Sequence, residues 1–382
     1  MLGVEVVIVA GGVGSRLRPL TLSRPKPLVP LAGKTLLEHI IEWFRANGFN
    51  DILVTAKYLG SMIKEYFSSY SRVKVLVVDS KDTADAVRLV SDQVSSELLF
   101  ISMSDVLCNA CFREFLEFHR RHGGEASIAL KEVDNPLHYG LVFIDREYRV
   151  KLFIEKPASI ELYALSLSHS LGRIRNIYST NLVNTGFYII NQTVLDILRK
   201  KPSLLDWGRH VFPYLVETGY RVYGWVMDKQ SYWMDLGRIE NYKQALWDLL
   251  SGSIKGYSPR YKAIEPRLYA SPNSSIEGRV VPPVYIGDNV VIREGATIGP
   301  FVSIEDNCVI GRNTSLSYTI VWENTVIENK SSLHNTIVMD NVVIGGNCRI
   351  KDSIIASHNK IPANTTLLYK TLKPGYRETR VG

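Results

Sequence analysis

The sequence predicts an α/β protein in which a Rossmann-like, mostly parallel sheet is followed by a hexapeptide-repeat parallel β-helix. Two observations predict this architecture. Over residues 1–250, apolar runs typical of buried strands alternate with segments of helical periodicity. After a stretch rich in Gly, Ser, Pro and Tyr, an aliphatic residue then recurs at every sixth position. We expect a first domain at 1–250, a linker at 251–283, the β-helix at 284–370 and a C-terminal tail at 371–382.

The first domain is expected to consist of βαβ units. In chain order the sequence predicts strand 4–10, helix 36–47, strand 52–56, helix 61–70, strand 73–78, helix 84–94 and strand 98–103. Strands that alternate with helices favour a mostly parallel sheet, whose ligands bind beyond the carboxyl ends of the strands. The loops after Ala10 and Met103 lie at such ends, so they are candidate parts of a functional site.

The second domain shows a period of six residues. Its aliphatic positions are Ile286, Ile292, Ile298, Ile304, Ile310 and Leu316, and after a slip in phase Val338, Ile344 and Ile350 resume the pattern. Neither an α-helix nor a simple hairpin sheet keeps a period of six. The pattern is typical of a parallel β-helix with three short strands per coil, one aliphatic side chain of each pointing inward. A β-sandwich with fortuitous spacing is the alternative.

Composition and charge exclude several classes of protein. Of the 382 residues 46% are hydrophobic and 22% are charged, as in ordinary globular proteins. The net charge of +7 is spread along the chain without a basic tail, which argues against a nucleic-acid partner. No apolar run reaches the ~18 residues of a membrane span, and the N-terminus lacks the basic region of a secretory signal. We expect a cytoplasmic protein with neither a nucleic-acid nor a membrane partner.

The four cysteines favour reduced thiols over a metal site. Cys108 and Cys111 form a C-x-x-C pair, while Cys308 and Cys348 lie far away in the sequence. A structural zinc site needs two further ligands near such a pair. Free thiols in a cytosolic protein are therefore the better interpretation.

The loop after the first predicted strand is the most informative segment. Gly11, Gly12 and Gly14 allow the backbone to approach a ligand and to direct N–H groups at phosphate oxygens. Arg16 follows, and Lys26 lies between two prolines that restrict its backbone. Cations beside a glycine loop suit a triphosphate and a departing pyrophosphate. A purely structural glycine turn is the alternative.

Two named phosphate-binding motifs do not fit this loop. The dinucleotide fingerprint G-x-G-x-x-G, started at Gly12, has Leu17 where its third glycine belongs. The Walker pattern ending in Gly33-Lys34-Thr35 has Leu28 where its first glycine belongs.

The loop and the following Pro25-Lys26-Pro27-Leu28-Val29-Pro30-Leu31-Ala32-Gly33-Lys34 closely resemble the N-terminal signature of sugar-1-phosphate nucleotidylyltransferases. The resemblance extends through almost the whole chain, in the order of the family's motifs. Further matching segments are Ser104-Asp105-Val106-Leu107, Tyr139-Gly140, Glu155-Lys156-Pro157, Asn184-Thr185-Gly186-Phe187-Tyr188 and Tyr232-Trp233-Met234-Asp235-Leu236-Gly237. Many members also carry a hexapeptide C-terminal region, which implies a left-handed β-helix here.

The resemblance implies a reaction of a nucleoside triphosphate with a sugar 1-phosphate, giving a nucleotide sugar and pyrophosphate. It implies Mg²⁺ held by Asp105 and Asp235, with Arg16 and Lys26 as catalytic cations. It further implies nucleotide binding by Gly11, Gly12, Gly14, Asp82 and Thr83, and sugar-phosphate binding by Gly140, Glu155, Lys156, Asn184 and Trp233. Glu155 would accept hydrogen bonds from sugar hydroxyls, and Lys156 would pair with the sugar phosphate. Homo-oligomers through the β-helix are also expected.

One departure from the family concerns the nucleotide-base segment. Asp82 opens the run Thr83-Ala84-Asp85-Ala86-Val87, where the family usually has glycine. A carboxylate there adds a negative charge near the nucleotide, or changes the backbone if that glycine has a positive φ. Our hypothesis is an altered selection of the base, with loss of activity as the alternative.

Each candidate residue also has a structural interpretation. Asp105 could cap a following helix, and Asp235 could be a plain turn residue. Glu155 and Lys156 could form a surface charge pair, Asn184 could belong to a turn, and Trp233 could be a core residue. His119 and His122 are expected on a solvated helix face. The insertion at 158–180, with Arg173 and Arg175, could form a lid or a dimer contact.

Two other functions compete with catalysis of nucleotidyl transfer. A non-catalytic scaffold, like the regulatory subunits of pyrophosphorylases or the related subunits of a translation-initiation exchange factor, shares the two-part layout. An acyltransferase activity of the β-helix would use a base such as His334 or His358. The charged set Arg16, Lys26, Asp105 and Asp235 favours an enzyme. The sequence leaves the base and the sugar open.

Overall fold

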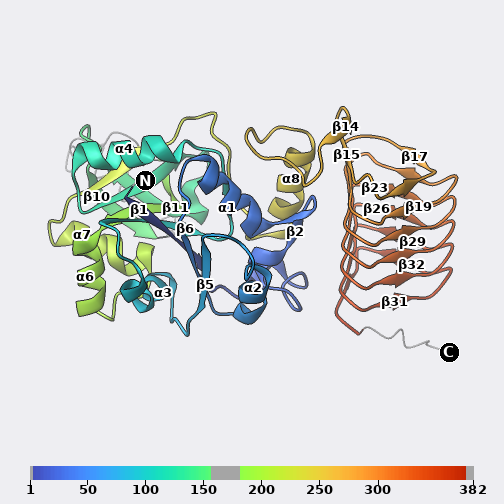
Figure 1. Ribbon diagram of the computed structural model, residues 1–382, viewed down its shortest axis with the longest axis horizontal. Helices are drawn as coiled ribbons and strands as arrows, with labels where there is room; N and C mark the ends of the chain where they lie inside the picture. The colour runs from blue at the N-terminus through green and yellow to red at the C-terminus, as the bar shows by residue number, and fades with distance from the viewer. Residues whose placement is uncertain (1–2, 156–180, 376–382) are drawn as a thin grey trace. The chain divides into compact units, whose positions relative to one another are not determined.

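The computed structural model describes residues 3–155 and 181–375 and separates into two compact units (Figure 1). Met1–Gly12 and Ile40–Met234 form the sheet unit, and Val13–His39 together with Asp235–Gly382 form the β-helix unit. The segment that carries Arg16 and Lys26 therefore belongs to the same unit as the β-helix. This division differs from the linear boundary that the sequence suggested near residue 250.

The sheet unit contains a nine-stranded mixed sheet in the order β10-β9-β11-β6-β1-β4-β5, in which β8 pairs with β11 and with β12. The strands are β1 Val4–Ala10, β4 Ile52–Ala56, β5 Val73–Val77, β6 Leu98–Met103, β8 Ala126–Glu132, β9 Gly140–Ile144, β10 Val150–Glu155, β11 Leu182–Asn191 and β12 Val222–Val226. The four strands β6, β1, β4 and β5 run parallel, as predicted. Short strands β7 Val106–Cys108 and β13 Trp233–Asp235 form a separate ladder, and β2 Pro30–Leu31 pairs with β3 Lys34–Thr35.

Helices connect these strands. They are α1 Leu36–Ala46, α2 Gly60–Tyr66, α3 Thr83–Leu89, α4 Phe112–His122, α6 Gln192–Lys200, α7 Phe212–Glu217 and α8 Ile239–Leu250. Single 3-10 turns are η1 Ser15–Leu17, η2 Lys26–Leu28, η3 Ser91–Gln93 and η4 Pro136–His138, and η5 Trp207–Val211 is a π-helical turn. The predicted helix 84–94 thus divides into α3 and η3.

The central strand β1 explains why the parallel sheet forms here. Its apolar side chains are buried, and Val7 pairs in register with Leu53 of β4 and Ile101 of β6. Successive side chains of β1 point to opposite faces of the sheet, and Val6, Val7, Ile8 and Val9 are all buried, so both faces are covered. Such a strand appears in the sequence as a continuous apolar run rather than as an alternation of apolar and polar residues. Ala10 and Met103 end β1 and β6 at the same edge of the sheet.

His119 is a correction to the sequence analysis. We expected a solvated position, but its side chain is 3% exposed and its Nδ1 lies 2.9 Å from Ser127 Oγ. It shares the buried face of α4 with Phe112, Phe115 and Leu116, at the spacing of an amphipathic helix. Burial lowers the pKa of His119 to about 4, so it is a neutral core residue.

The β-helix is built from three sheets whose strands stack from coil to coil (Figure 1). The stacked strands run parallel, except that β14 (Ala263–Glu265) pairs antiparallel with β15 (Leu268–Ala270) at the start of the first sheet. The first sheet contains β14 Ala263–Glu265, β15 Leu268–Ala270, β18 Val284–Ile286, β21 Val302–Ile304, β24 Thr319–Val321, β27 Ile337–Val338, β30 Ile354–Ile355 and β33 Thr371–Leu372. The second contains β16 Ser275–Ile276, β19 Val291–Ile292, β22 Val309–Ile310, β25 Val326–Ile327, β28 Val343–Ile344 and β31 Lys360–Ile361. The third contains β17 Arg279–Val280, β20 Thr297–Ile298, β23 Ser315–Ser317, β26 Ser332–His334, β29 Arg349–Lys351 and β32 Thr366–Leu368. This arrangement is consistent with the expected left-handed β-helix.

The coil length explains the slip in phase after Leu316. Val284 pairs with Val302, a step of 18 residues, whereas Ile320 pairs with Ile337, a step of 17. Later coils lack one residue at the corner that precedes the first sheet, so the spacing of core side chains becomes six, six and five. Asparagines occupy other corners with positive φ, including Asn307, Asn324 and Asn341, a conformation that Asn tolerates better than most residues.

The segment 251–283 that we expected as a linker contains four strands, β14 to β17. Three of them, β15, β16 and β17, pair with the next coil, so the stacking of coils already begins at Leu268. The cysteines Cys108, Cys308 and Cys348 are buried free thiols, and Cys111 is an exposed one. Within residues 3–155 and 181–375, no helix is long and apolar enough to cross a membrane.

Inside the β-helix unit, one buried carboxyl joins the β-helix to the N-terminal segment. Glu305 is 5% exposed, and its Oε2 accepts a hydrogen bond from the backbone N–H of Gly33 at 3.0 Å. Ser303 Oγ donates to Oε1 at 3.1 Å. Burial, reinforced by the nearby carboxylates of Glu323 and Asp306, raises the pKa of Glu305 to about 8.

We predict that this carboxyl makes stability depend on pH. The unfolded chain releases this proton near pH 4.5, whereas the folded chain holds it up to about pH 8. Stability is therefore fully present below about pH 4.5 and falls as pH rises through that window, by up to ~1.4 kcal/mol per pH unit. Urea unfolding at pH 5 to 8 should show a weaker dependence for Glu305→Gln than for the wild type. The exposed Glu328→Gln is the control, and equal slopes for Glu305→Gln and the wild type would contradict this assignment.

Candidate functional site

Two cations in the β-helix unit share one carboxylate. Lys26 Nζ lies 3.6 Å from Asp235 Oδ1, and Arg16 Nη2 lies 3.8 Å from Asp235 Oδ2. The Lys26 side chain is 8% exposed, Asp235 is 26% exposed and Arg16 is 60% exposed. A buried ammonium requires a nearby negative charge, so Asp235 stabilises Lys26. The exposed guanidinium of Arg16 is available to a ligand from solvent.

Two glycines shape this cluster. Gly14 has φ +65°, and Thr21 Oγ1 donates to its carbonyl oxygen at 2.8 Å, which closes the turn before Arg16. A Cβ on Gly237 would lie 2.7 Å from Arg16 Nη2 and 2.9 Å from Asp235 Oδ1. Any side chain at position 237 would therefore displace the Arg16–Asp235 pair. Gly11 and Gly12, by contrast, would each accept a Cβ without a close contact.

A carboxylate of the sheet unit lies between two glycines. At both Gly140 and Gly208 a Cβ would come within 2.6 Å of Glu155 Oε2. The missing side chains make room for this carboxylate, which is half-buried at the end of β10. The sequence pointed to Gly140 and Glu155. It gave no signal for Gly208, which lies in η5 more than fifty residues further along the chain.

Tyr188 is a buried tyrosine on which three carboxylates of the sheet unit act electrostatically. Its hydroxyl accepts a hydrogen bond from Asn184 Nδ2 at 2.9 Å. Burial raises its pKa, and the charges of Asp206, Glu155 and Asp105 act in the same direction. These three carboxylates therefore all lie near the Tyr188 ring. Asn184 also accepts from the N–H of Gly186 at 3.1 Å, so its side chain organises the turn within β11 as well.

Trp233 is held by a hydrogen bond and a ring contact, and Asp105 lies in a turn between two strands. Trp233 Nε1 donates to the Thr185 carbonyl at 3.1 Å, and its half-buried ring meets Tyr139 edge-on at 5.1 Å. Asp105 is half-buried in the turn that joins β6 to β7. The proposed helix cap at Asp105 is wrong, because the strand β7 follows it rather than a helix.

Asp82 precedes α3 in ordinary extended backbone, with φ −158°. The chain therefore needs no left-handed backbone at this position, and the added carboxylate is the part of the departure from glycine that the structure retains. Its Oδ1 accepts from the N–H of Thr83 at 2.9 Å, and its Oδ2 accepts from Arg209 Nη2 at 2.6 Å. Thr83 Oγ1 in turn donates to Asp206 Oδ2 at 3.0 Å. Asp82 thus caps the helix and forms an ion pair with a residue that the sequence analysis did not identify.

The candidate residues are divided between the two units. The sheet unit contains Gly11, Gly12, Asp82, Thr83, Asp105, Gly140, Glu155, Asn184 and Trp233, and the β-helix unit contains Gly14, Arg16, Lys26 and Asp235. Lys156, Arg173 and Arg175 lie outside the described residues, as does the whole of the 158–180 insertion. Among the described residues, no three His, Cys, Asp or Glu side chains gather closely enough to hold a metal by themselves.

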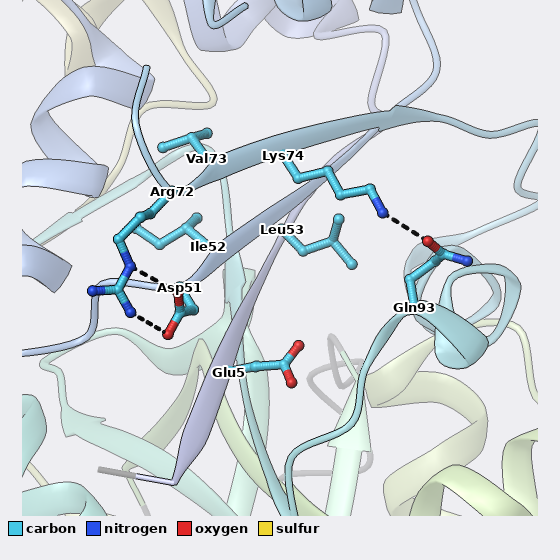
Figure 2. Close-up of a pocket in the computed structure, with 8 residues that line it drawn as sticks. All are labelled: Glu5, Asp51, Ile52, Leu53, Arg72, Val73, Lys74 and Gln93. Carbon is cyan, nitrogen blue, oxygen red and sulfur yellow. Dashed lines mark hydrogen bonds and ion pairs between the residues drawn. The ribbon is translucent and has the colours of Figure 1, made fainter. Parts of the chain in front are cut away.

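A pocket at the opposite edge of the sheet provides a contrast (Figure 2). It lies at the amino ends of β1, β4 and β5. Arg72 donates two hydrogen bonds to Asp51, at 2.6 and 2.9 Å, and Lys74 donates to Gln93 at 2.7 Å. These cations are already paired within the protein, and ligands of such sheets bind at the carboxyl edge. The carboxyl-end residues are therefore the candidate functional site.

Comparison with known proteins identifies relatives over most of the chain. The sequence pattern described as Nucleotidyl transferase matches residues 5–252, and the pattern described as GMPPB C-terminal domain matches residues 280–374. Mannose-1-phosphate guanylyltransferase 1 of Arabidopsis thaliana is 31% identical over 82% of this chain and 80% of its own length. The mannose-1-phosphate guanylyltransferase catalytic subunit beta of Dictyostelium discoideum is 31% identical over 83% and 80%, and that of Drosophila melanogaster is 32% identical over 75% and 72%.

The geometry of Asp82 predicts a specific effect on stability. Asp82→Ala removes a helix cap and should reduce the free energy of unfolding by ~1 kcal/mol. Asp82→Asn keeps the capping oxygen and loses only a partly exposed ion pair, so its loss should be smaller. Urea unfolding measures both variants, with the exposed Asp92→Ala as the control. A loss for Asp82→Asn as large as that for Asp82→Ala would show that the cap is not the main contribution.

Proposed function

Because the chain belongs to the nucleotidyl transferase family and is a sugar-1-phosphate nucleotidylyltransferase, we propose that its substrates are GTP and mannose 1-phosphate. The products are then GDP-mannose and pyrophosphate. The relatives described above are named for this reaction, and the similarity extends over both domains. The observation that carries the assignment of roles is the pair of cations, Lys26 and Arg16, on the single carboxylate of Asp235.

The chemistry requires charge neutralisation more than covalent work by the protein. An oxygen of the sugar phosphate attacks the α-phosphorus in line, and the bond from that phosphorus to the bridging oxygen breaks. The electron pair of that bond leaves with pyrophosphate. Lys26 and Arg16 bind the β- and γ-phosphates and stabilise the charge that develops there. Since Lys26 is held by Asp235 and by a short 3-10 turn, little reorganisation is needed as the charge develops.

The sheet unit supplies the contacts to the sugar phosphate. The Glu155 carboxylate, between Gly140 and Gly208, accepts hydrogen bonds from sugar hydroxyls. Asn184 contributes beside Tyr188, and Trp233 forms a wall of the pocket. Lys156 pairs with the phosphate in this proposal. A side chain at Gly140 or Gly208 would crowd the Glu155 carboxylate and would therefore disturb these contacts.

The glycine loop and the start of α3 bind the nucleotide. Backbone N–H groups near Gly11, Gly12 and Gly14 face the phosphates, and Asp82 with Thr83 lies toward the base. Asp82 is paired with Arg209, so it presents an ion pair to the base rather than an isolated negative charge. This pairing argues against loss of activity as the consequence of the departure from glycine. The hypothesis of altered base selection is tested by comparing the rate with GTP to the rates with the other nucleoside triphosphates.

We propose that Asp105 and Asp235 hold Mg²⁺ together with phosphate oxygens. Carboxylate oxygens are hard ligands of the kind that Mg²⁺ prefers, and one or two carboxylates suffice when phosphates complete the set. The absence of a complete protein cage among the described residues fits such a shared site. When bound, the ion would neutralise charge on the phosphates. Asp235 would then serve both the ion and Lys26.

Two further properties stay predictions and are part of this proposal: the formation of homo-oligomers through the β-helix, and a cytoplasmic location. For an acyltransferase role, His334 Nδ1 lies 2.8 Å from Ser317 Oγ on an exposed strand surface, and His358 is an exposed corner residue. The charged cluster of Arg16, Lys26 and Asp235 supports nucleotidyl transfer and gives no support to an acyltransferase role.

The proposed substrates predict a selective signal in a pyrophosphate-release assay. With Mg²⁺, GTP and mannose 1-phosphate should give the highest rate among ATP, GTP, CTP, UTP and dTTP combined with glucose, mannose and N-acetylglucosamine 1-phosphates. Single contacts to base or sugar contribute ~1–3 kcal/mol, so discrimination of about tenfold or more is expected. A higher rate of pyrophosphate release with another pair would show that GTP and mannose 1-phosphate are not the preferred substrates. If the folded protein released no pyrophosphate with any pair, the proposed nucleotidyl transfer would be contradicted.

The proposed ion predicts that activity disappears on chelation and returns with Mg²⁺. Asp105→Ala and Asp235→Ala should each lower kcat/KM by about a hundredfold or more, corresponding to ~3 kcal/mol of lost transition-state stabilisation. Asp79→Ala, which changes a carboxylate with a 95% exposed side chain, is the control and should retain its rate. Retained turnover in Asp105→Ala, or a rate insensitive to chelator, would refute the metal role.

A further inference from the structure

Arg24 connects the segment around Lys26 to the β-helix. Its guanidinium pairs with the Glu323 carboxylate, and its Nη2 lies 3.7 Å from Asp340 Oδ1. The guanidinium also lies over the ring of Trp322, 5.0 Å from the ring centre. The Arg24 side chain is 19% exposed and Asp340 is 10% exposed, so water screens this cluster far less than a surface ion pair.

The acidic partners of Arg24 come from neighbouring coils. Val321 pairs with Val338 in register, so Glu323 and Asp340, each two residues further on, are equivalent positions one coil apart. The next equivalent position is Ser357, whose Oγ donates to Asp340 Oδ1 at 2.7 Å and lies 3.3 Å from Ser23 Oγ. The stacking of coils therefore places a column of oxygen atoms against residues 23 and 24.

A second set of contacts holds the chain on the other side of Lys26. Tyr242 Oη donates to the carbonyl of Pro30 at 2.8 Å and accepts from Trp322 Nε1 at 3.2 Å. The N–H of Gly33 donates to Glu305. The segment 23–33 is thus attached to the β-helix both before and after Lys26, and Trp322 participates on both sides.

We propose that Arg24 is a positioning residue, through which the carboxylates of Glu323 and Asp340 fix Lys26 for the departing pyrophosphate. Lysine carries its charge on a flexible stem, so its backbone must be fixed if the ammonium is to be placed accurately. Prolines on both sides of Lys26 restrict φ, and only Pro25 separates it from Arg24. A shift of the Arg24 backbone is therefore transmitted to Lys26 rather than absorbed. The β-helix thereby becomes part of the catalytic apparatus. This inference rests on the proposed role of Lys26.

The test is a double-mutant cycle on the full-length enzyme. Arg24→Met keeps the aliphatic stem and removes the charge. We expect kcat to fall about tenfold or more, because small misplacements of a catalytic group are costly. In the reverse reaction, KM for pyrophosphate should rise while KM for the nucleotide sugar stays within about threefold. On the Lys26→Met background the same change should have almost no further effect, since the two residues act as one unit.

Control variants separate positioning from general stability. Arg260 also forms an ion pair with the β-helix, at 2.9 Å from Asp306. It touches the segment 23–33 through its backbone N–H, which donates to the Ala32 carbonyl at 3.0 Å and is kept when the side chain is changed. Arg260→Met should leave kcat within about threefold of the wild type. Arg24→Lys keeps a positive charge toward Glu323 and should recover most of the lost rate. Should Arg24→Met fold poorly, Glu323→Gln weakens the same contact and should change kcat and the pyrophosphate KM in the same direction.

The outcomes are distinguishable. An unchanged kcat in folded Arg24→Met, or equal losses from Arg24→Met with and without Lys26, would overturn the positioning role. So would equal losses from Arg260→Met and Arg24→Met. If Lys26→Met itself retained full activity, the proposed role of Lys26 would fail first, and the inference with it.

Discussion

The need of a buried ammonium for a negative partner is the constraint on which the site depends. Lys26 is almost fully buried, and an uncompensated charge there would cost several kcal/mol. Asp235 provides the compensation and also holds the more exposed Arg16. Two cations thus lie at one carboxylate, and cations so placed suit a triphosphate. The same carboxylate, beside phosphate oxygens, is a suitable ligand for a divalent cation.

The β-helix gains a role from the way the chain divides in space. The segment 13–39 belongs to the β-helix unit although it is among the earliest in the sequence. Buried contacts from Glu305, Tyr242 and Asp340 hold it there. In a parallel β-helix, equivalent positions repeat from coil to coil, so acidic side chains two residues after the core position form a column. This regularity gives the segment that carries Lys26 a row of regularly spaced attachment points on the β-helix.

Most of the fold could be predicted from the sequence because its signals are local. The strands at 4–10, 52–56 and 98–103 agree with the structure residue for residue, since buried parallel strands appear as apolar runs. The period of six located the β-helix, and the step to five residues after Leu316 accounts for the slip in phase. The prediction that His119 is solvated was wrong. Its apolar neighbours on α4 determine which face of the helix is buried, and histidine as a residue type does not show whether its side chain is buried or exposed.

The residues of the candidate site could be picked out from the sequence only where a short motif marks them. Asp105, Glu155 and Asp235 each follow or end a strand, in segments with a recognisable order. Gly208, Asp206 and Arg24 had no such signal, because their partners are distant in the sequence and meet only in the folded chain. Asp82 shows the intermediate case. Its position was identified, but its extended backbone and its pairing with Arg209 required the structure.

The most direct measurement is the affinity of GTP and of GMP for the wild type and for Lys26→Met, by titration calorimetry in the presence of Mg²⁺. The account assigns Lys26 to the β- and γ-phosphates, which GMP lacks. It predicts that Lys26→Met weakens GTP binding about tenfold or more, as for the loss of a charged phosphate contact, while GMP binding stays unchanged. Equal affinities of both proteins for GTP, or an equal loss for GMP, would contradict the assignment.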